Sequence, residues 1–380
     1  MHLYLHVPFC ARKCSYCDFA IAVRRQVPSS AYADAVLREW AMWQGHAAWN
    51  ESSEIETIYF GGGTPSLLDP LELSRILEGI HGQKPVNAQA ELTLEVNPDD
   101  VTAERARVWR SLGLNRISLG VQSFDPVVLA WMHRTHTAAD VPRAVATLRA
   151  HGFANISLDL IYALPPDLGR DWARDLDEAF ALEPEHLSLY GLTVEERTPV
   201  ARWVARGQTT RSDDETYARE FIVADSALRA SGYQHYEVSN ASKPGFRSRH
   251  NSAYWRRRPF IGLGPSAHSG FGRERRWNIR EWTAYETAIG QGQGAMEGSE
   301  SLDDAAVALE DLYLGLRTSE GVPESTLPAR TVRSWLAEGW AVRSDGRITL
   351  SAEGWLRLDA LVASVETSAS CPPGLSLEHA

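Results

Sequence analysis

Apolar positions of this chain recur in six short runs typical of β-strands, and stretches with helical periodicity separate them. The runs are LYLHV from Leu3, IETIYF from Ile55, ELTLEV from Glu91, RISLGV from Arg116, NISLDL from Asn155 and HLSLYGL from His186. The clearest helical patterns cover residues 31–43, 71–80, 138–151 and 172–180. Short strands that alternate with helices indicate βα repetition and a parallel sheet. The pattern therefore predicts an α/β protein with six βα units.

The last part of the chain follows a different pattern. From position 303 it predicts two helices, a hairpin in WAVRSDGRITL with Asp345-Gly346 as the tight turn, and a final helix from Ser351. This arrangement resembles a winged-helix module. Winged helices often bind DNA, but the hairpin carries only Arg343 and Arg347 within an acidic chain, which favours a lid or docking role.

Length, net charge and the lack of long apolar stretches limit the number of domains, the kinds of partner and the cellular site that are expected. With 380 residues the chain exceeds the roughly 250–300 residues at which single cores stop growing, so one large and one smaller domain are expected. The formal net charge of -11 opposes attraction to phosphate backbones, and the arginine runs at 256–258 and 273–276 are expected to be solvated surface. We therefore expect no nucleic-acid partner. No long apolar stretch suggests a secretion signal or a membrane span, so a cytoplasmic protein is expected.

Three of the four cysteines lie close together, in HVPFCARKCSYCDF, with the spacing C-x3-C-x2-C. Clustered thiols in a reducing compartment indicate soft ligands for a metal or cluster rather than a disulfide framework. Iron-sulfur and zinc both remain open on this pattern, because the nearby His6 would complete a four-ligand zinc site. Cys371 lies in the Ser/Pro-rich tail and is assigned no role.

Three thiolates leave one iron of a four-iron cluster without a protein ligand, and a small molecule can occupy that position. The spacing of Cys10, Cys14 and Cys17 resembles the signature of the radical S-adenosylmethionine (SAM) superfamily. That resemblance implies a [4Fe-4S] cluster on these three cysteines, chelated by SAM. It also implies an open, partial (β/α)6 TIM-like barrel. The sequence leaves open whether SAM is cleaved, and so whether the protein is an enzyme.

Polar residues follow or close most of the predicted strands, where β/α barrels carry their working residues. One such segment, GGGT from Gly61, lacks the G-x-G-x-x-G and Walker patterns, which disfavours a dinucleotide or a nucleoside triphosphate. The resemblance implies a SAM pocket lined by Tyr4, Tyr16, Gly62, Gly63, Thr64, Glu95, Gln122, Arg134 and Asp159. An acidic Glu95 and a basic Arg134 suit a ligand with both an ammonium and a carboxylate.

Longer strings extend the resemblance over nearly the whole chain to the group of coproporphyrinogen dehydrogenases and HemW heme chaperones. They are YFGGGTPSLL, EVNPDD, RISLGVQSF, LDLIYALP and YEVSNAS. The dehydrogenases carry a fourth cysteine where Phe19 stands here, and an extension before the first strand, which here begins at Leu3. Residues 249–255 reproduce the H-N-x-x-Y-W motif associated with heme binding in HemW. The motif implies that His250 is a heme ligand.

The HemW subgroup implies a chaperone that binds heme and a SAM-coordinated cluster and transfers heme to an acceptor protein. The alternative is an oxygen-independent coproporphyrinogen III dehydrogenase of porphyrin biosynthesis. No pattern identifies the acceptor or the electron donor, and peripheral contact with a membrane-bound acceptor stays open. The expected organisation is a radical SAM barrel over residues 1–232 and a connecting region with the heme motif, closing the barrel, over 233–300. A smaller, winged-helix-like α+β domain over 301–366 and a flexible tail over 367–380 follow.

Overall fold

The computed structural model describes residues 1–50 and 52–366, which divide into two compact units. The first unit comprises Met1–His235 and Ser239–Ser301, and the second comprises Tyr236–Val238 and residues 302–366. The predicted tail at 367–380, with Cys371, lies outside the described residues.

Six parallel strands form the centre of the first unit. They are β1 (His2–Val7), β4 (Ile55–Gly62), β5 (Val86–Val96), β6 (Arg116–Gln122), β7 (Ile156–Tyr162) and β8 (His186–Gly191). Their order in the sheet follows the chain, and each neighbouring pair is parallel. Leu3, Leu5 and Val7 on one face of β1 and His2 and His6 on the other are all buried, as expected for parallel strands that are covered on both faces. The predicted partial (β/α)6 architecture is confirmed.

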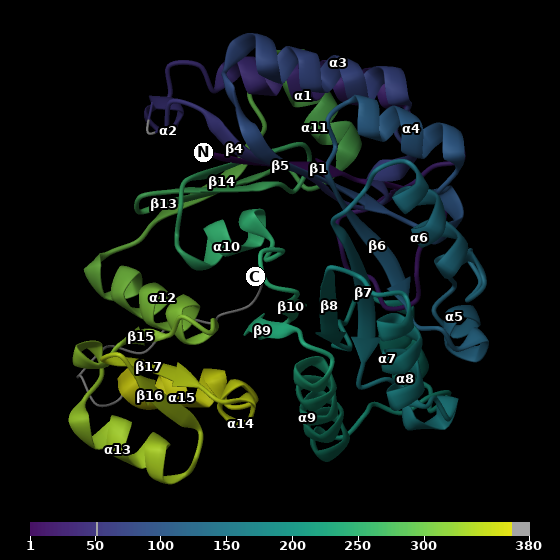
Figure 1. Cartoon of the computed structure of the whole chain (residues 1–380). Coiled ribbons are helices and arrows are strands. Elements are labelled where there is room, and N and C mark those ends of the chain that lie inside the picture. The colour runs from purple at the N-terminus through teal and green to yellow at the C-terminus, as the bar shows by residue number, and fades with distance from the viewer. Residues whose placement is uncertain (51, 367–380) are drawn as a thin grey trace. The chain divides into compact units, whose positions relative to one another are not determined.

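Helices connect these strands and lie along the outer face of the curved sheet (Figure 1). They are α1 (Ser29–Met42), α2 (Ala47–Asn50), α3 (Pro70–Gln83), α4 (Ala103–Ser111), α5 (Pro126–Trp131), α6 (Asp140–Ala150), α7 (Trp172–Ala181), α8 (Pro199–Ala205) and α9 (Asp214–Ala230). Several begin at a side chain that accepts a free backbone N–H, such as Asp69 for α3 and Thr102 for α4. The four predicted helical patterns correspond to α1, α3, α6 and α7.

Short 3-10 turns that begin with proline follow three of the parallel strands. They are Pro65–Leu67 after β4, Pro98–Asp100 after β5 and Pro166–Leu168 after β7. Proline has no N–H to donate to a strand ladder, so the chain leaves the sheet at these points. Thr64 after β4 and Asn97 after β5 therefore lie at the carboxyl edge of the sheet.

The sheet continues on both sides of the parallel core, which the apolar pattern did not predict. The added strands are β9 (Gln234–Glu237), β10 (Asn240–Ser242), β11 (Phe260–Leu263), β12 (His268–Phe271), β13 (Glu274–Asn278) and β14 (Met296–Ser301). β11 pairs in parallel with β1, whereas β10 and β12 to β14 pair antiparallel. Helices α10 (Arg249–Trp255) and α11 (Trp282–Gly290) belong to this region. These strands are short or polar, as in MEGSES of β14, so no periodicity marks them.

The second unit holds a three-stranded antiparallel sheet with helices. Its elements are α12 (Asp304–Leu316), β15 (Val322–Pro323), α13 (Ala329–Ala337), β16 (Ala341–Ser344), β17 (Arg347–Leu350), α14 (Ala352–Trp355) and α15 (Leu358–Glu366). Asp345 and Gly346, with φ of 50° and 72°, join β16 to β17. Positive φ at both positions is the signature of a type I′ turn, so the predicted hairpin is confirmed. The winged-helix resemblance of this unit stays a prediction.

Candidate functional site

The three clustered cysteines lie on the loop that leaves β1. A short ladder between β2 (Phe9–Cys10) and β3 (Ala22–Val23) closes this loop at its base. All three thiols are free and partly exposed. The backbone N–H of Ser15 donates to the carbonyl of Met132 at 3.2 Å, and the carbonyl of Ser15 accepts from Val200 N–H at 3.1 Å. The loop is thus held against the end of α5 and the start of α8.

The structure does not place His6 as the fourth ligand of a zinc site with the three cysteines. Within residues 1–50 and 52–366, no three His, Cys, Asp or Glu side chains converge as ligands of one metal ion. His6, the fourth ligand in the zinc alternative, has both ring nitrogens engaged: Nδ1 lies 3.2 Å from the Tyr4 hydroxyl and Nε2 lies 2.9 Å from the carbonyl oxygen of Ala20. A four-iron cluster needs thiols spread over a wider space than one ion does.

The glycine loop packs tightly against the segment that leads into Cys10. Gly62 has a φ of 110°, and a Cβ there would lie 2.6 Å from Cε1 of His6. A Cβ on Gly63 would lie 2.8 Å from backbone atoms of residues 7–9. Thr64 donates its hydroxyl to Sγ of Cys10 at 3.5 Å. Because Gly62 and Gly63 have no side chain, the backbone of this loop can lie close to residues 6–9 and bring Thr64 beside Cys10.

Glu95, near the carboxyl end of β5, contacts the same glycine loop. Its Oε2 accepts from Gly62 N–H at 3.0 Å, and its Oε1 accepts from the Tyr59 hydroxyl at 2.8 Å. Desolvation by the surrounding protein raises the pKa of Glu95 to about 7, although both hydrogen bonds oppose the rise. A cation placed against this carboxyl would favour its ionised form. Glu95 is therefore suited to an ammonium group.

Arg134 lies between the cysteine loop and the end of β6. Its Nη2 donates to Oδ1 of Asn97 at 2.6 Å and to the carbonyl of Gly120 at 2.7 Å. Its Nη1 lies 3.7 Å from Sγ of Cys14, and its Nε lies 3.4 Å from Nδ1 of His136. The guanidinium is therefore held in one orientation, where it offers a positive charge to an anionic group beside Cys14.

Gln122 is the last residue of β6 and adopts a left-handed φ of 68°. The register between β6 and β7 shifts between Gly120 and Gln122, and such bulges re-aim side chains at strand ends. A Cβ on Gly120 would lie 3.1 Å from Nε2 of Gln122 and 3.4 Å from Nη2 of Arg134. The amide and the guanidinium therefore lie on the same side of this strand end.

Asp159 and the two tyrosines complete the predicted pocket positions. Asp159 lies within β7, and its carboxylate accepts from the hydroxyls of Ser118 at 2.9 Å and Ser157 at 3.3 Å. Tyr4 is on β1, and Tyr16 packs against a small core around Met132. The structure thus brings residues 62–64, Glu95 and Arg134 together around the cysteine loop, with Gln122 adjacent. Asp159 accepts from serines of the barrel strands, and its charge helps to raise the pKa of Glu95.

His250 is buried on α10, with 1% of its surface exposed. Its Nδ1 lies 2.6 Å from the Thr57 hydroxyl, and its Nε2 lies 2.7 Å from the Tyr254 hydroxyl. The ring stacks on Tyr59, the partner of Glu95, with 5.0 Å between centroids. Burial, helped by the charge of Arg116, lowers the pKa of His250 well below its usual range, so the imidazole is neutral.

Sequence reasoning missed two residues that orient this site. Tyr59 holds Glu95, and Asn97 holds Arg134. Both lie in segments that carry the family resemblance, Tyr59 in YFGGGTPSLL and Asn97 in EVNPDD, close to predicted pocket residues. The signal was therefore present, but spacing along one strand does not reveal a partner on another.

Two comparisons with known sequences agree on the family. The radical SAM superfamily profile matches residues 4–179. The heme chaperone HemW of Mycobacterium tuberculosis is 34% identical over 366 residues, which cover 96% of this chain and 94% of that protein. HemW of Escherichia coli is 37% identical over 269 residues, or 70% and 69% of the two chains.

Among solved structures, coproporphyrinogen III oxidase (HemN) of Escherichia coli superposes with a TM-score of 0.80 at 22% identity, covering 96% of this chain and 90% of HemN. At that identity the likeness supports the fold. The relatives found by sequence also show the family, because they match most of both chains at more than 30% identity. The chain therefore belongs to the HemW family of the radical SAM superfamily.

Proposed function

We propose that this protein is a heme chaperone that binds heme and a SAM-coordinated [4Fe-4S] cluster and transfers heme to an acceptor protein. The observation that carries this proposal is the set of three free thiols on one loop, flanked by Thr64 and Arg134. Similarity to HemW over 96% of the chain supports the heme function. Membership of the radical SAM superfamily implies SAM and the cluster.

The residues divide the proposed binding work by charge and shape. Cys10, Cys14 and Cys17 would hold the cluster, which would supply one electron to SAM if SAM is cleaved. Glu95 would accept a hydrogen bond from the amino group of SAM, and Arg134 would face its carboxylate. The remaining pocket positions shape the site and exclude water; they are Tyr4, Tyr16, Gly62, Gly63, Thr64, Gln122 and Asp159.

SAM affinity is expected to fall as the pH drops from about 8 to about 6. The pKa of Glu95 is about 7 before binding, and the ligand's positive charge favours the ionised carboxyl, so binding releases a proton from Glu95. Below the unbound pKa, this release costs up to about tenfold in affinity for each pH unit. Equilibrium dialysis of reconstituted protein with SAM measures the slope.

The matched control for this pH effect is Glu95→Gln, which keeps the shape of the side chain and removes its titration. SAM's own amine titrates equally in both experiments, so the difference in slope isolates Glu95. Equal slopes in the two proteins would show that the carboxyl does not respond to SAM.

For heme, His250 is the proposed axial ligand. Its neutral ring can offer a lone pair to iron, and Tyr254 and Trp255 lie on the same short helix. The Nε2 atom is engaged by the Tyr254 hydroxyl at 2.7 Å, so ligation through Nε2 requires that this hydrogen bond be released. Heme loading through this atom is therefore expected to couple to a local movement of α10.

Titration with hemin tests this proposal on three proteins. His250→Ala is expected to lose at least about tenfold in affinity and to change the Soret band, because a metal–ligand bond is removed. Tyr254→Phe frees Nε2 and keeps the ring, so its affinity should equal or exceed that of the wild type. If His250→Ala binds with wild-type affinity, His250 is not the ligand. If the wild type binds no heme, the chaperone proposal fails.

A second candidate function is oxygen-independent coproporphyrinogen III dehydrogenation. The fold likeness to HemN, at a TM-score of 0.80, favours keeping it. Against it stands Phe19, 67% exposed, at the position where the resemblance to those enzymes implies a fourth cysteine. An anaerobic assay with coproporphyrinogen III, SAM and a reductant separates the two functions. Robust formation of protoporphyrinogen would overturn the chaperone assignment.

The acceptor protein and the cellular site belong to the proposal as well. Every helix within the described parts of the chain is too short or too polar to cross a membrane. A formal charge of -11 and cysteines that suit a reducing compartment support placing the protein in the cytoplasm. From there it would deliver heme to an acceptor protein, which includes peripheral contact with an acceptor bound to a membrane.

A further inference from the structure

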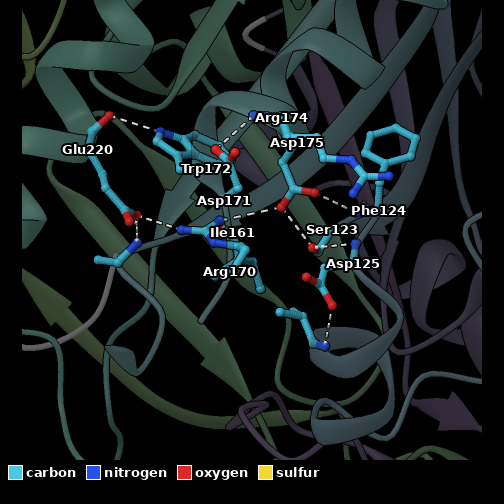
Figure 2. Close-up of polar contacts among 12 residues, drawn as sticks. Ser123, Phe124, Asp125, Ile161, Arg170, Asp171, Trp172, Arg174, Asp175 and Glu220 are labelled. Atoms are coloured by element: carbon cyan, nitrogen blue, oxygen red, sulfur yellow. Dashed lines mark hydrogen bonds and ion pairs between the residues drawn. The ribbon is translucent and has the colours of Figure 1, made fainter. Parts of the chain in front are cut away.

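A buried ion cluster outside the predicted pocket joins the ends of β6 and β7 to α7 and α9 (Figure 2). Nη2 of Arg170 donates to Oε2 of Glu220 at 2.6 Å. Its Nη1 donates to the carbonyl of Ile161 at 3.0 Å and lies 3.5 Å from Oδ2 of Asp175. The side chains of Arg170 and Asp175 are only 3% and 2% exposed. The guanidinium also lies 4.7 Å from the ring centroid of Trp172.

Asp175 binds the segment that follows Gln122. Its Oδ2 accepts from the Ser123 hydroxyl at 2.7 Å, and its Oδ1 accepts from Phe124 N–H at 2.8 Å. Oγ of Ser123 in turn accepts from Asp125 N–H at 3.1 Å. A left-handed φ of 68° at Gln122 is costly for a residue other than glycine, and it persists only where its surroundings hold it. Asp175 restrains this position by binding Ser123 and Phe124, the two residues that follow Gln122.

Glu220 acts in the same way at the end of β7. Its Oε2 accepts from Ala163 N–H at 2.7 Å, and Ala163 is also left-handed, with a φ of 55°. The Trp172 indole N–H donates to the backbone carbonyl of Glu220 at 3.0 Å, which anchors α9 at the residue that carries this carboxylate. Two strained positions at neighbouring strand ends are therefore bound by carboxylates that share one arginine.

The influence of this cluster reaches the cysteine loop through α5. Asp125 caps the start of α5 by accepting from Val127 N–H at 2.7 Å. At the other end of α5, the carbonyl of Met132 accepts from Ser15 N–H in the cysteine loop, and Arg134 follows two residues later. The segment from residue 122 to residue 134 thus carries two proposed SAM contacts and one support of the cysteine loop.

We propose that Arg170, Asp175 and Glu220 form a clamp that positions Gln122 and, through α5, Arg134 for SAM binding. They are positioning residues, since their contacts are with other parts of the protein. Buried ion pairs contribute little net stability compared with apolar packing, so stability alone gives little reason for one here. Fixing two strained loops does give a reason, because these carboxylates accept the N–H groups of Phe124 and Ala163. The inference rests on the proposed SAM function.

The test compares Asp175→Asn with Asp171→Asn in the full chain. Asp175→Asn keeps the size of the side chain but turns an N–H group toward Arg170 or the segment at 123–124. Asp171 is an exposed cap four residues earlier on α7, and asparagine caps a helix equally well. Two measurements are made: SAM affinity of the reconstituted protein together with its iron content, and amide hydrogen exchange of residues 120–126 without cofactors.

For Asp175→Asn we expect faster exchange at Phe124, unchanged iron content, and a SAM dissociation constant raised by about 10- to 100-fold, the range in which lost positioning usually falls. Asp171→Asn should match the wild type in all three. If Asp175→Asn folds poorly, Ser123→Ala removes the adjoining contact and should raise the dissociation constant in the same direction.

Wild-type SAM affinity in Asp175→Asn, with faster exchange at Phe124, would overturn the clamp, because the contact would be lost without consequence. Unchanged exchange would overturn it too, since the side chain would not hold this segment. A wild-type protein that binds the cluster but no SAM would instead contradict the proposed SAM function. In that case the exchange comparison still decides whether the clamp holds its loop.

Discussion

Replacing Cys10, Cys14 and Cys17 together with alanine is expected to abolish iron binding and to lower SAM affinity by more than about 100-fold. Changes to groups that only support a metal ligand already cost about 10- to 100-fold, and here the ligands themselves are removed. The three thiols are free and lie on one loop that backbone hydrogen bonds attach to α5 and α8. Iron and sulfide analysis after anaerobic reconstitution, followed by SAM dialysis, measures both quantities.

The fourth cysteine provides the control for this experiment. Cys371→Ala changes a thiol of the same sequence that no motif includes, and it should leave iron content and SAM affinity at wild-type values. Retention of both by the triple variant would contradict the cluster assignment and, with it, the proposed SAM site. If the wild-type protein binds zinc in place of iron and sulfide, that result would instead support the single-ion alternative.

Gly63→Ala is expected to lower the free energy of unfolding by about 3 kcal/mol, since overpacking a close contact costs about 1–3 kcal/mol and more where nothing can move. The added Cβ would lie 2.8 Å from atoms of the backbone at residues 7–9. It would also disturb the hydrogen bonds from Gly63 N–H to Val7 and from Thr64 N–H to Phe9, both 2.8 Å long. Urea unfolding measures the change.

A glycine on the surface of α3 gives the matched comparison. No atom lies within 4 Å of a Cβ added to Gly82, so Gly82→Ala should leave stability unchanged or raise it by up to about 1 kcal/mol through helix propensity. Gly63 precedes Thr64, the partner of Cys10, so iron content should fall in Gly63→Ala and stay at the wild-type value in Gly82→Ala. Equal stability of the two variants would show that the loop has room for a side chain.

The barrel core was predictable because most of its strands carry an apolar residue at every second position, a pattern that is local in sequence. Five of the six runs match the observed strands within two residues at each end; the run from Glu91 meets the end of β5, whose start at Val86 the pattern missed. The outer strands were not predictable. β12 to β14 are stabilised by pairing with a neighbour, and residues such as the MEGSES segment of β14 carry no alternating apolar face.

The same contrast holds within the site. The cysteine spacing is local in sequence, so it can be read directly, whereas the Arg170 clamp joins residues from 123 to 220 that share no motif. His250 shows the contrast between a motif that is local in sequence and contacts that arise only in space. Its motif suggested a heme ligand, but its stacking on Tyr59 and its bond to Thr57 arise from strands far away along the chain.

Local patterns along the chain were enough to predict the α/β class, the parallel strands and the loop of three cysteines, because each depends on residues close together in the chain. How Glu95, Arg134 and the segment after Gln122 are held became visible only in the folded protein, because their partners come from other strands and helices. Hydrogen bonds and burial depend on distances in space, and these follow from the packing of the whole sheet rather than from spacing along the chain.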